Sequence, residues 1–244
     1  TTCFIPCGAK MPIIGLIAGA MFGGSSLVAV SAYFIGMAAI ICSGIMLKKT
    51  KLFAGDPAPF VMELPAYHVP AWGNVLRATW ERGWSFIKRA GTVILLATVI
   101  LWFAQGFGFE NGAFGMIEDQ DNSILAIVAT KVAWIFAPLG FGNWKATVAS
   151  VTGLIAKENV VSTFGVLYHF GGELSENGDE IWAAVAQDYT ALSAYAFMIF
   201  NLLCAPCFAA MGAIKREMNN GKWTAIAIGY MCLFAYCASL VVYQ

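Results

Sequence analysis

Residues 205–211, with the sequence APCFAAM, lie inside an uncharged run that extends from 189 to 214. Pro206 has no backbone N–H, and its ring clashes with the preceding turn, so a helix through this stretch must break or kink. A break inside a bilayer frees backbone carbonyls, and here it places the thiol of Cys207 beside them. Such a break suits a binding site better than a lipid-facing span. The stretch therefore predicts a membrane helix that is broken or re-entrant.

The same pattern, Pro-Cys-x-Ala-x-Met, begins at Pro6 and again at Pro206. Two copies at opposite ends of a hydrophobic array indicate an internal repeat whose broken helices meet at one site. The alternative is two unrelated kinks with inert cysteines, because a buried free cysteine usually behaves as a small hydrophobe. The repeat predicts that Cys7 and Cys207 approach within about 12 Å at mid-membrane and flank one metal path with bonds of ~2.3 Å.

The composition excludes a soluble domain of this length. The chain is 59% hydrophobic and 11% charged, with a mean hydropathy of +0.72, whereas soluble domains carry about 25% charged residues. A formal net charge of zero gives no support for nucleic-acid binding. The seven cysteines mostly fall in apolar segments, which argues against a secreted disulfide framework. Cys204-x-x-Cys207 has neither a second pair nor a neighbouring histidine, so it is a weak indication of zinc.

The first third of the chain predicts a span followed by a cytoplasmic connection. Residues 26–47 are uncharged and long enough to cross about 30 Å of hydrocarbon. Lysines follow at 48, 49 and 51, so the positive-inside rule places this end in the cytoplasm. After a proline-rich connection, Trp and aliphatic residues recur every three or four positions over 72–87. This spacing predicts an amphipathic helix in the cytoplasmic headgroup layer, with a solvent-facing linker helix as the alternative.

The remaining chain predicts a bundle of membrane segments. Two loops, 110–123 and 171–188, hold nine of the fourteen acidic residues and no Lys or Arg, so we expect both loops outside. The total is six or seven membrane segments, and the fold class is an all-α polytopic transmembrane helical bundle with broken or re-entrant helices. The apolar stretches in this part are 91–109, 124–139, 146–170, 189–214 and 223–244.

Lys157 and Glu158 stand inside the apolar stretch 146–170. Each costs about 2.5–3.5 kcal/mol at the centre of a span, so such residues normally face the bundle interior or a wet cavity. We expect Glu158 to face the interior near the two cysteine motifs, as an iron or proton relay. The alternative is that both residues pair with neighbouring helices and fix their packing.

Sulfur ligands are the strongest candidates for a metal path. Cys7 and Cys207 offer thiolates, and Met11 and Met211, four residues later, offer thioethers. Such ligands suit Fe(II), Zn(II) or Cu(I) better than Mg or Ca. A transport site must also release its ion, so few protein ligands are expected. His169 could belong to an outer vestibule but is more simply an interfacial residue, and His68 is treated as a surface residue.

No motif in the chain supports enzymatic chemistry. The sequence contains no G-x-x-x-x-G-K-[ST], no G-x-S-x-G and no H-E-x-x-H. The chain is therefore predicted to be a transporter region and not an enzyme.

Six motifs in order resemble the membrane region of the bacterial ferrous iron transport protein B family. The resemblance covers nearly the whole chain. The motifs are PCGAKMP at 6–12, ELP at 63–65, WER at 80–82 with KRAGT at 88–92, PLGFG at 138–142, AKE at 156–158 with VST at 161–163, and PC at 206–207.

This resemblance implies two gate repeats that form an Fe(II) path across the cell inner membrane into the cytoplasm. It assigns Cys7 and Cys207 as gate cysteines and Glu158 as a membrane-embedded acid; with Met11 and Met211 they form the predicted metal set. The resemblance divides the chain into a partial first gate motif with a span (1–47), a cytoplasmic connection with an interfacial helix (48–90), and a bundle with the second gate motif near 205–214 (91–244).

The resemblance also implies partners outside this chain. The chain begins with Thr1 inside the first motif, so we expect a fragment of a longer protein. GTP and Mg²⁺ would act only through an N-terminal GTPase domain, and Fe²⁺ would be the transported substrate. A small cytoplasmic accessory protein and a homo-oligomer are further expectations, together with the lipid bilayer. The alternatives are another gate-fold protein, such as a nucleoside transporter, and a non-transporting membrane scaffold.

Overall fold

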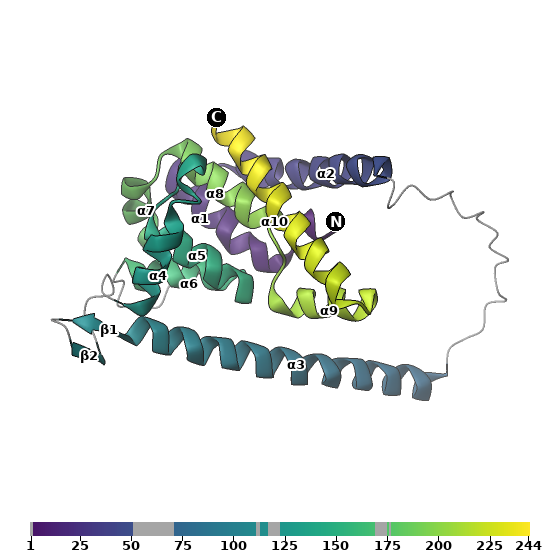
Figure 1. The fold of residues 1–244 in the computed structure, drawn as a ribbon. Helices are drawn as coiled ribbons and strands as arrows, with labels where there is room; N and C mark the ends of the chain where they lie inside the picture. The colour runs from purple at the N-terminus through teal and green to yellow at the C-terminus, as the bar shows by residue number, and fades with distance from the viewer. Residues whose placement is uncertain (1, 51–70, 111–112, 117–122, 169–174, 176) are drawn as a thin grey trace.

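The computed structural model describes residues 2–50, 71–110, 113–116, 123–168, 175 and 177–244. Helices dominate, as the sequence predicts (Figure 1). They are α1 (Met11–Phe22), α2 (Ser26–Lys49), α3 (Trp72–Gly106), α4 (Ile124–Ala133), α5 (Trp144–Ile155), α6 (Asn159–Leu167), α7 (Trp182–Asp188), α8 (Ala191–Leu203), α9 (Phe208–Met218) and α10 (Gly221–Tyr243), with 3-10 turns at Thr2–Phe4, Gly8–Lys10, Ala137–Leu139 and Asp179–Ile181.

The central helix of the bundle is α8. It begins at a capping box in which Thr190 and Ser193 satisfy each other's backbone N–H groups. It then packs against α10, α1, α2 and α5. Phe197, on α8, meets Phe141 and Phe164 edge-to-face with ring centroids 5.3 and 5.7 Å apart, an arrangement that aromatic pairs prefer. The end of α8 is therefore fixed deep inside the molecule.

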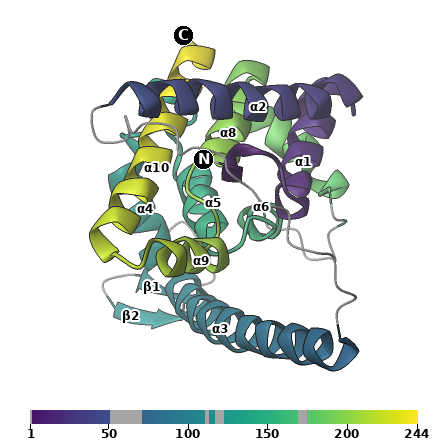
Figure 2. The same cartoon turned by 90° about the vertical axis from the view of Figure 1, so that its right-hand side faces the viewer.

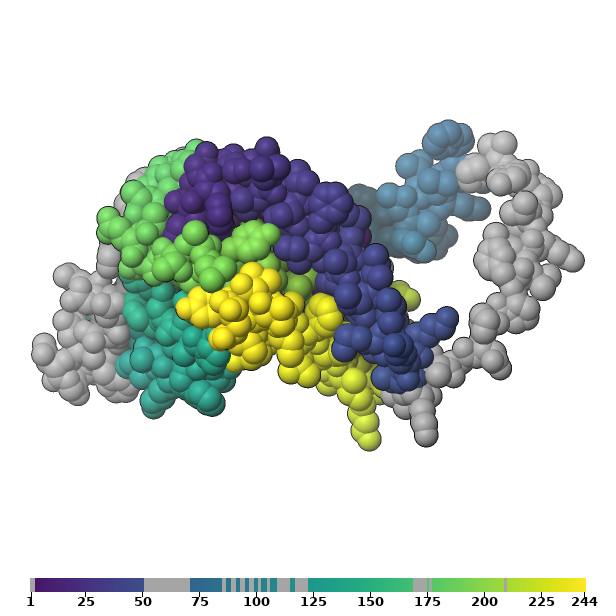
Figure 3. Space-filling view, turned by 90° about the horizontal axis from the view of Figure 1, so that it is seen from above, coloured from purple at the N-terminus to yellow at the C-terminus, as the bar shows by residue number. Residues whose placement is uncertain are grey.

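Two long helices, α2 and α10, lie side by side on one face of the bundle (Figure 3). Both are apolar on every side, yet the inward face of α2 carries small residues such as Ala32, Gly36 and Ala39, all buried. Large side chains point outward, including Phe34 on α2 and Val241 on α10, at 63% and 77% exposure. Small residues inside and large apolar residues outside are typical of helices that pack in lipid. Ser43 on α2 and Tyr230 on α10 join the two helices through a 2.8 Å hydrogen bond.

Two helices among the described residues are long and apolar enough to cross a membrane, namely α2 and α10. This is fewer than the six or seven segments expected. Two of the predicted spans are divided, because 146–170 contains α5 and α6, and 189–214 contains α8 and α9; a third, 124–139, contains only the short α4 and a 3-10 turn. Three further apolar helices, Gly8–Phe22, Ile124–Ala133 and Ala191–Leu203, are shorter than a span.

The segment around α3 departs from the expectation in two ways. The predicted interfacial helix and the following span form one continuous helix of 35 residues, which runs along the side of the bundle opposite α2 (Figures 1 and 2). An antiparallel hairpin then follows, with β1 (Phe107–Glu110) paired to β2 (Ala113–Met116). The predicted helical class is confirmed for most of the described residues, and this two-stranded hairpin is the exception. Trp72, Trp80 and Trp84 on α3 are exposed, at 79%, 71% and 56%.

Candidate functional site

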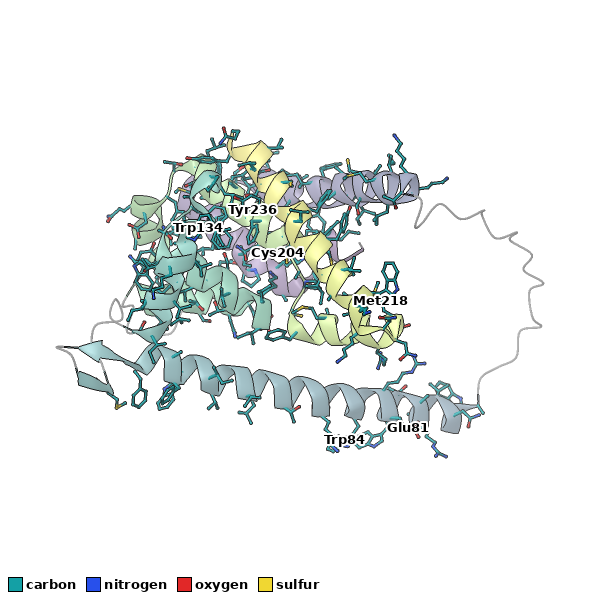
Figure 4. All side chains as sticks on the ribbon, in the orientation of Figure 1. Glu81, Trp84, Trp134, Cys204, Met218 and Tyr236 are labelled. Carbon is teal, nitrogen blue, oxygen red and sulfur yellow. The ribbon has the colours of Figure 1, made fainter. Side chains whose placement is uncertain are left out.

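The break between α8 and α9 lies where Pro206 predicts it. Cys204 and Cys207 both have extended ψ angles, 175° and 160°, and α9 begins at Phe208. A helix that ends inside a protein leaves its last carbonyls without helical partners. The end of α8 therefore presents acceptors, and the thiol of the buried Cys204 lies just beyond them in the bundle interior (Figure 4).

A second break was not predicted. Ala156 is extended, with φ −148° and ψ 128°, and it separates α5 from α6. Lys157 and Glu158 form the turn between the two helices. The turn directs Lys157 inward, where it is 1% exposed and its Nζ donates to Cys204 Sγ at 2.9 Å. The break thus connects α5–α6 to the end of α8.

The first motif reaches the same place through Lys10. Cys7 precedes the 3-10 turn Gly8–Lys10, and the Lys10 side chain is 3% exposed. Its Nζ donates to Cys3 O at 2.6 Å and to Leu202 O, in the last turn of α8, at 2.7 Å. The ammonium therefore satisfies one carbonyl at the C-terminus of α8, where the helix dipole favours a cation.

Two buried ammonium groups consequently lie at the end of α8. Lys10 and Lys157 interact electrostatically with each other and, in the case of Lys10, with Cys3, Cys7 and Cys204. Burying an ammonium is costly unless its protons are hydrogen-bonded. Here carbonyl oxygens and a sulfur accept those hydrogen bonds. The bonds hold together the three places where a helix begins or is interrupted, at 7–10, 156–158 and 204–207. We call this cluster of Lys10, Lys157, Leu202 O and Cys204 the lysine junction.

An incompletely satisfied amide lies next to the lysine junction. Asn201 is fully buried on α8; its Nδ2 donates to Phe197 O at 3.1 Å, whereas Oδ1 has no hydrogen-bond partner within the described part of the chain. Ser150 Oγ on α5 is the other such atom there. A Cβ at Gly153 on α5 would lie 3.5 Å from Asn201 Oδ1 and 3.9 Å from Lys157 Cδ. The unpaired oxygen thus faces the same part of α5 as the lysine stem.

The predicted metal set is only partly buried. Cys7 is exposed, and Cys207 and Met211 are half-buried. Met11 is 39% exposed, with its Sδ 3.9 Å from Tyr33 Oη. Among the residues that the structure describes, no group of three or more His, Cys, Asp or Glu could hold a metal ion. The ligand roles of these four sulfur residues stay predictions.

Glu158 does not face the bundle interior, contrary to the expectation. It is exposed at the N-cap of α6, and within the described residues it makes no hydrogen bond or ion pair. The physical reason is the break at Ala156: a continuous helix would place Glu158 differently, whereas the turn sends Lys157 inward and its neighbour outward. His68, His169 and the ELP motif at 63–65 lie outside the described residues.

Sequence reasoning missed Lys10, Cys204 and Asn201 as site residues. Lys10 stood within the repeated motif, at a position where the second copy has Ala210. A lysine in an apolar setting was the available signal. Asn201 was the one amide in the uncharged run 189–214. Cys204 was considered only as half of a weak Cys-x-x-Cys zinc pattern, and its contact with Lys157, 47 residues away, has no local signal.

A smaller polar cluster lies at Asp188, the last residue of α7. Its Oδ2 accepts hydrogen bonds from Lys145 Nζ at 3.1 Å and Tyr168 Oη at 2.8 Å. Partial burial raises the pKa of Asp188, but the hydrogen bonds from Tyr168 and Lys145 outweigh it, so the net pKa lies below its ordinary value. The loop 171–188 was expected to lack a compensating base, and Lys145 of α5 supplies one.

This cluster predicts a pH dependence. A carboxyl with a lowered folded pKa stabilises the fold above its unfolded pKa of about 3.9 and loses that contribution as pH falls through the folded value. Asp188→Asn should therefore lower the free energy of unfolding at pH 7 by about 0.5–1 kcal/mol, a small amount because the Lys145–Asp188 pair is partly exposed. The same variant should lose less stability than the parent as the pH falls below about 4. Thermal unfolding in detergent from pH 7 to pH 3 measures this, with Glu217→Gln on α9 as the matched exposed control. Equal acid limbs in parent and Asp188→Asn would contradict it.

Comparison with known proteins places the chain in a family. Residues 87–221 match the model described as "Nucleoside recognition", a gate domain, and residues 29–82 match "Ferrous iron transport protein B C terminus". None of the solved structures matches the chain significantly.

Relatives cover almost the entire chain. It is 35% identical over 242 residues to the Fe(2+) transporter FeoB of Staphylococcus aureus strain COL, covering 99% of this chain and 35% of that protein. The Methanocaldococcus jannaschii protein of the same name is 34% identical over 98% of this chain and 35% of the relative. The protein of that name from Salmonella typhi is 32% identical over 99% of this chain and 37% of the relative. The chain thus spans about a third of the length of these curated relatives. Together, the two family models and the relatives show that the chain belongs to the ferrous iron transport protein B family and contains its gate domain.

Proposed function

We propose that this chain is the multi-pass membrane region of an inner-membrane transporter that moves Fe(II) into the cytoplasm. One observation carries the proposal: three segments that interrupt helices lie together in the bundle. They are 7–10, 156–158 and 204–207, and the hydrogen bonds of Lys10 and Lys157 join them. Broken helices that meet inside a membrane bundle are the usual setting of a transport site. The relatives, named Fe(2+) transporter, support ferrous iron as the ion.

In this proposal the gate sulfurs line the path. Cys7 and Cys207 directly precede the turn at Gly8 and the helix α9, so their thiols stand where the backbone is least regular. Met11 and Met211 follow one helical turn later. Few and mixed ligands suit an ion that must leave again. The chain itself catalyses no reaction, and GTP hydrolysis belongs to an N-terminal GTPase domain outside this chain.

The main alternative is nucleoside transport, which the printed name of the gate model suggests. Full-length protein in proteoliposomes, with radiolabelled Fe(II) kept reduced outside, separates the two. The proposal expects saturable iron uptake that excess unlabelled nucleoside does not reduce. Nucleoside uptake without iron uptake would establish the alternative, and uptake of neither would favour a scaffold.

We expect Glu158 to contribute to iron transport and not to the stability of the fold. The exposed carboxylate makes no bond within the described residues, so Glu158→Gln should change the free energy of unfolding by less than about 0.5 kcal/mol. We expect the same variant to lower iron uptake about tenfold or more, because Glu158 directly follows Lys157 of the lysine junction, and an exposed carboxylate there attracts cations to the entrance of the path. Iron uptake at the parental rate by folded Glu158→Gln protein would rule out the relay. Glu217→Gln on α9 is the exposed control.

A further inference from the structure

We propose that Cys204 Sγ and Asn201 Oδ1 form an additional cation-coordination point at the end of α8, which the Lys157 ammonium occupies in this structure. A divalent cation of borderline softness, of which Fe(II) is one, takes the position when Lys157 leaves. The inference rests on the proposed function, because it adds a coordination point to the same iron path.

The first support is the present occupant. Lys157 Nζ lies 2.9 Å from Cys204 Sγ, and the two residues are 1% and 3% exposed. Sulfur is a weak hydrogen-bond acceptor, so it serves an ammonium poorly. It is, however, a preferred ligand of Fe(II) and related ions. The buried Cys204 sulfur thus contacts the Lys157 ammonium, although a metal ion such as Fe(II) would be a better partner for it.

The second support is the unpaired oxygen of Asn201. Asn201 and Cys204 are three residues apart at the end of α8, so they lie on one face. The hydrogen bond from Nδ2 to Phe197 O fixes the amide, and Oδ1 is left without a partner in the described part of the chain. A fully buried unsatisfied oxygen is costly and calls for a ligand. A metal ion on Cys204 would give it one.

The third support is the position of Lys157 in the turn between α5 and α6. An ammonium and a divalent ion repel each other strongly in a low-dielectric interior, so they cannot share one sulfur. Ion entry must move Lys157, and a two-residue turn allows this more easily than a continuous helix. Glu158, exposed and next in the chain, offers the departing ammonium an anionic neighbour. The exchange replaces one cation by another: the ammonium keeps its proton, and the Cys204 thiol releases its proton to water as the metal–thiolate bond forms.

The test uses Co(II) as the probe on purified full-length protein in detergent, with Cys7 and Cys207 both replaced by serine. Sulfur ligation gives cobalt a thiolate charge-transfer absorption. Lys157→Met should lower the Co(II) concentration at half-saturation roughly tenfold, because the competing occupant is gone. Lys157→Arg, which keeps the charge, should stay at the parental value. Asn201→Leu should raise the half-saturation concentration.

The decisive comparison adds Cys204→Ser to Lys157→Met, which should abolish the absorption gained by Lys157→Met. Unchanged titration in Lys157→Met, or absorption that survives Cys204→Ser, would overturn the proposal. Where Lys157→Met does not fold, Lys157→Gln serves in its place with the same expectations, and Lys131→Met on α4 is the exposed control. The gate cysteines are absent from these proteins, so failure here leaves the proposed function untouched, and failure of iron uptake is seen independently in the intact protein.

Discussion

Lys10→Met is expected to lower the free energy of unfolding by about 3–5 kcal/mol, the largest stability effect that we predict for a single side chain. Methionine keeps the length of the stem but removes the ammonium that donates to Cys3 O and Leu202 O. Both carbonyls would then be buried without a partner, which costs about 1–3 kcal/mol each. The first motif would also lose its attachment to α8.

Thermal or denaturant unfolding of the purified protein in detergent measures this effect. Lys131→Met on α4 is the matched control, because Lys131 is exposed and makes no hydrogen bond or ion pair in the described residues; its effect should stay within about 0.5 kcal/mol. Lys10→Arg keeps the charge and the donors and should recover part of the loss. A Lys10→Met protein as stable as the control would show that the lysine junction does not hold the motifs together.

Cys207→Ser is expected to reduce Fe(II) uptake about 10–100-fold at low iron, the range found when groups that support a metal site are altered. Serine preserves the size and the extended backbone before α9 but replaces a soft sulfur by a hard hydroxyl. Because Cys207 is a free, half-buried cysteine and serine is close to it in size, folding should persist.

Uptake into proteoliposomes at several iron concentrations measures this prediction. Cys237→Ser is the control, since Cys237 is exposed on the outward face of α10. A defect that high iron relieves indicates lost affinity, as expected for a ligand. Parental uptake by Cys207→Ser at low iron would reject the ligand role.

Local signals predicted the elements that depend on local chemistry. Pro206 ends α8 because proline cannot continue a helix, and the uncharged run at 26–47 became α2. The β1–β2 hairpin also had a local signal that was overlooked, Asn111-Gly112 between aromatic residues. The continuous α3 follows from the absence of proline between 72 and 106.

The candidate site was less predictable, because it depends on long-range contacts. The break at Ala156 has no proline or glycine beside it, and Lys157 finds its acceptor 47 residues away. Lys10 meets Leu202 across 192 residues. From the local sequence alone, Lys10 is only a basic residue that precedes an apolar helix. The exposure of Glu158 follows from the same break and could not be foreseen from helical spacing.

The central claim is that the two Pro-Cys motifs serve one iron path. A double-mutant cycle of Fe(II) uptake with Cys7→Ser, Cys207→Ser and both together tests it most directly, with folding checked by gel filtration. Two sulfurs that contact one ion act as a unit, so the account predicts that the double variant is little worse than the more severe single variant. Uptake losses that simply multiply, or single variants that transport iron at the parental rate, would contradict it.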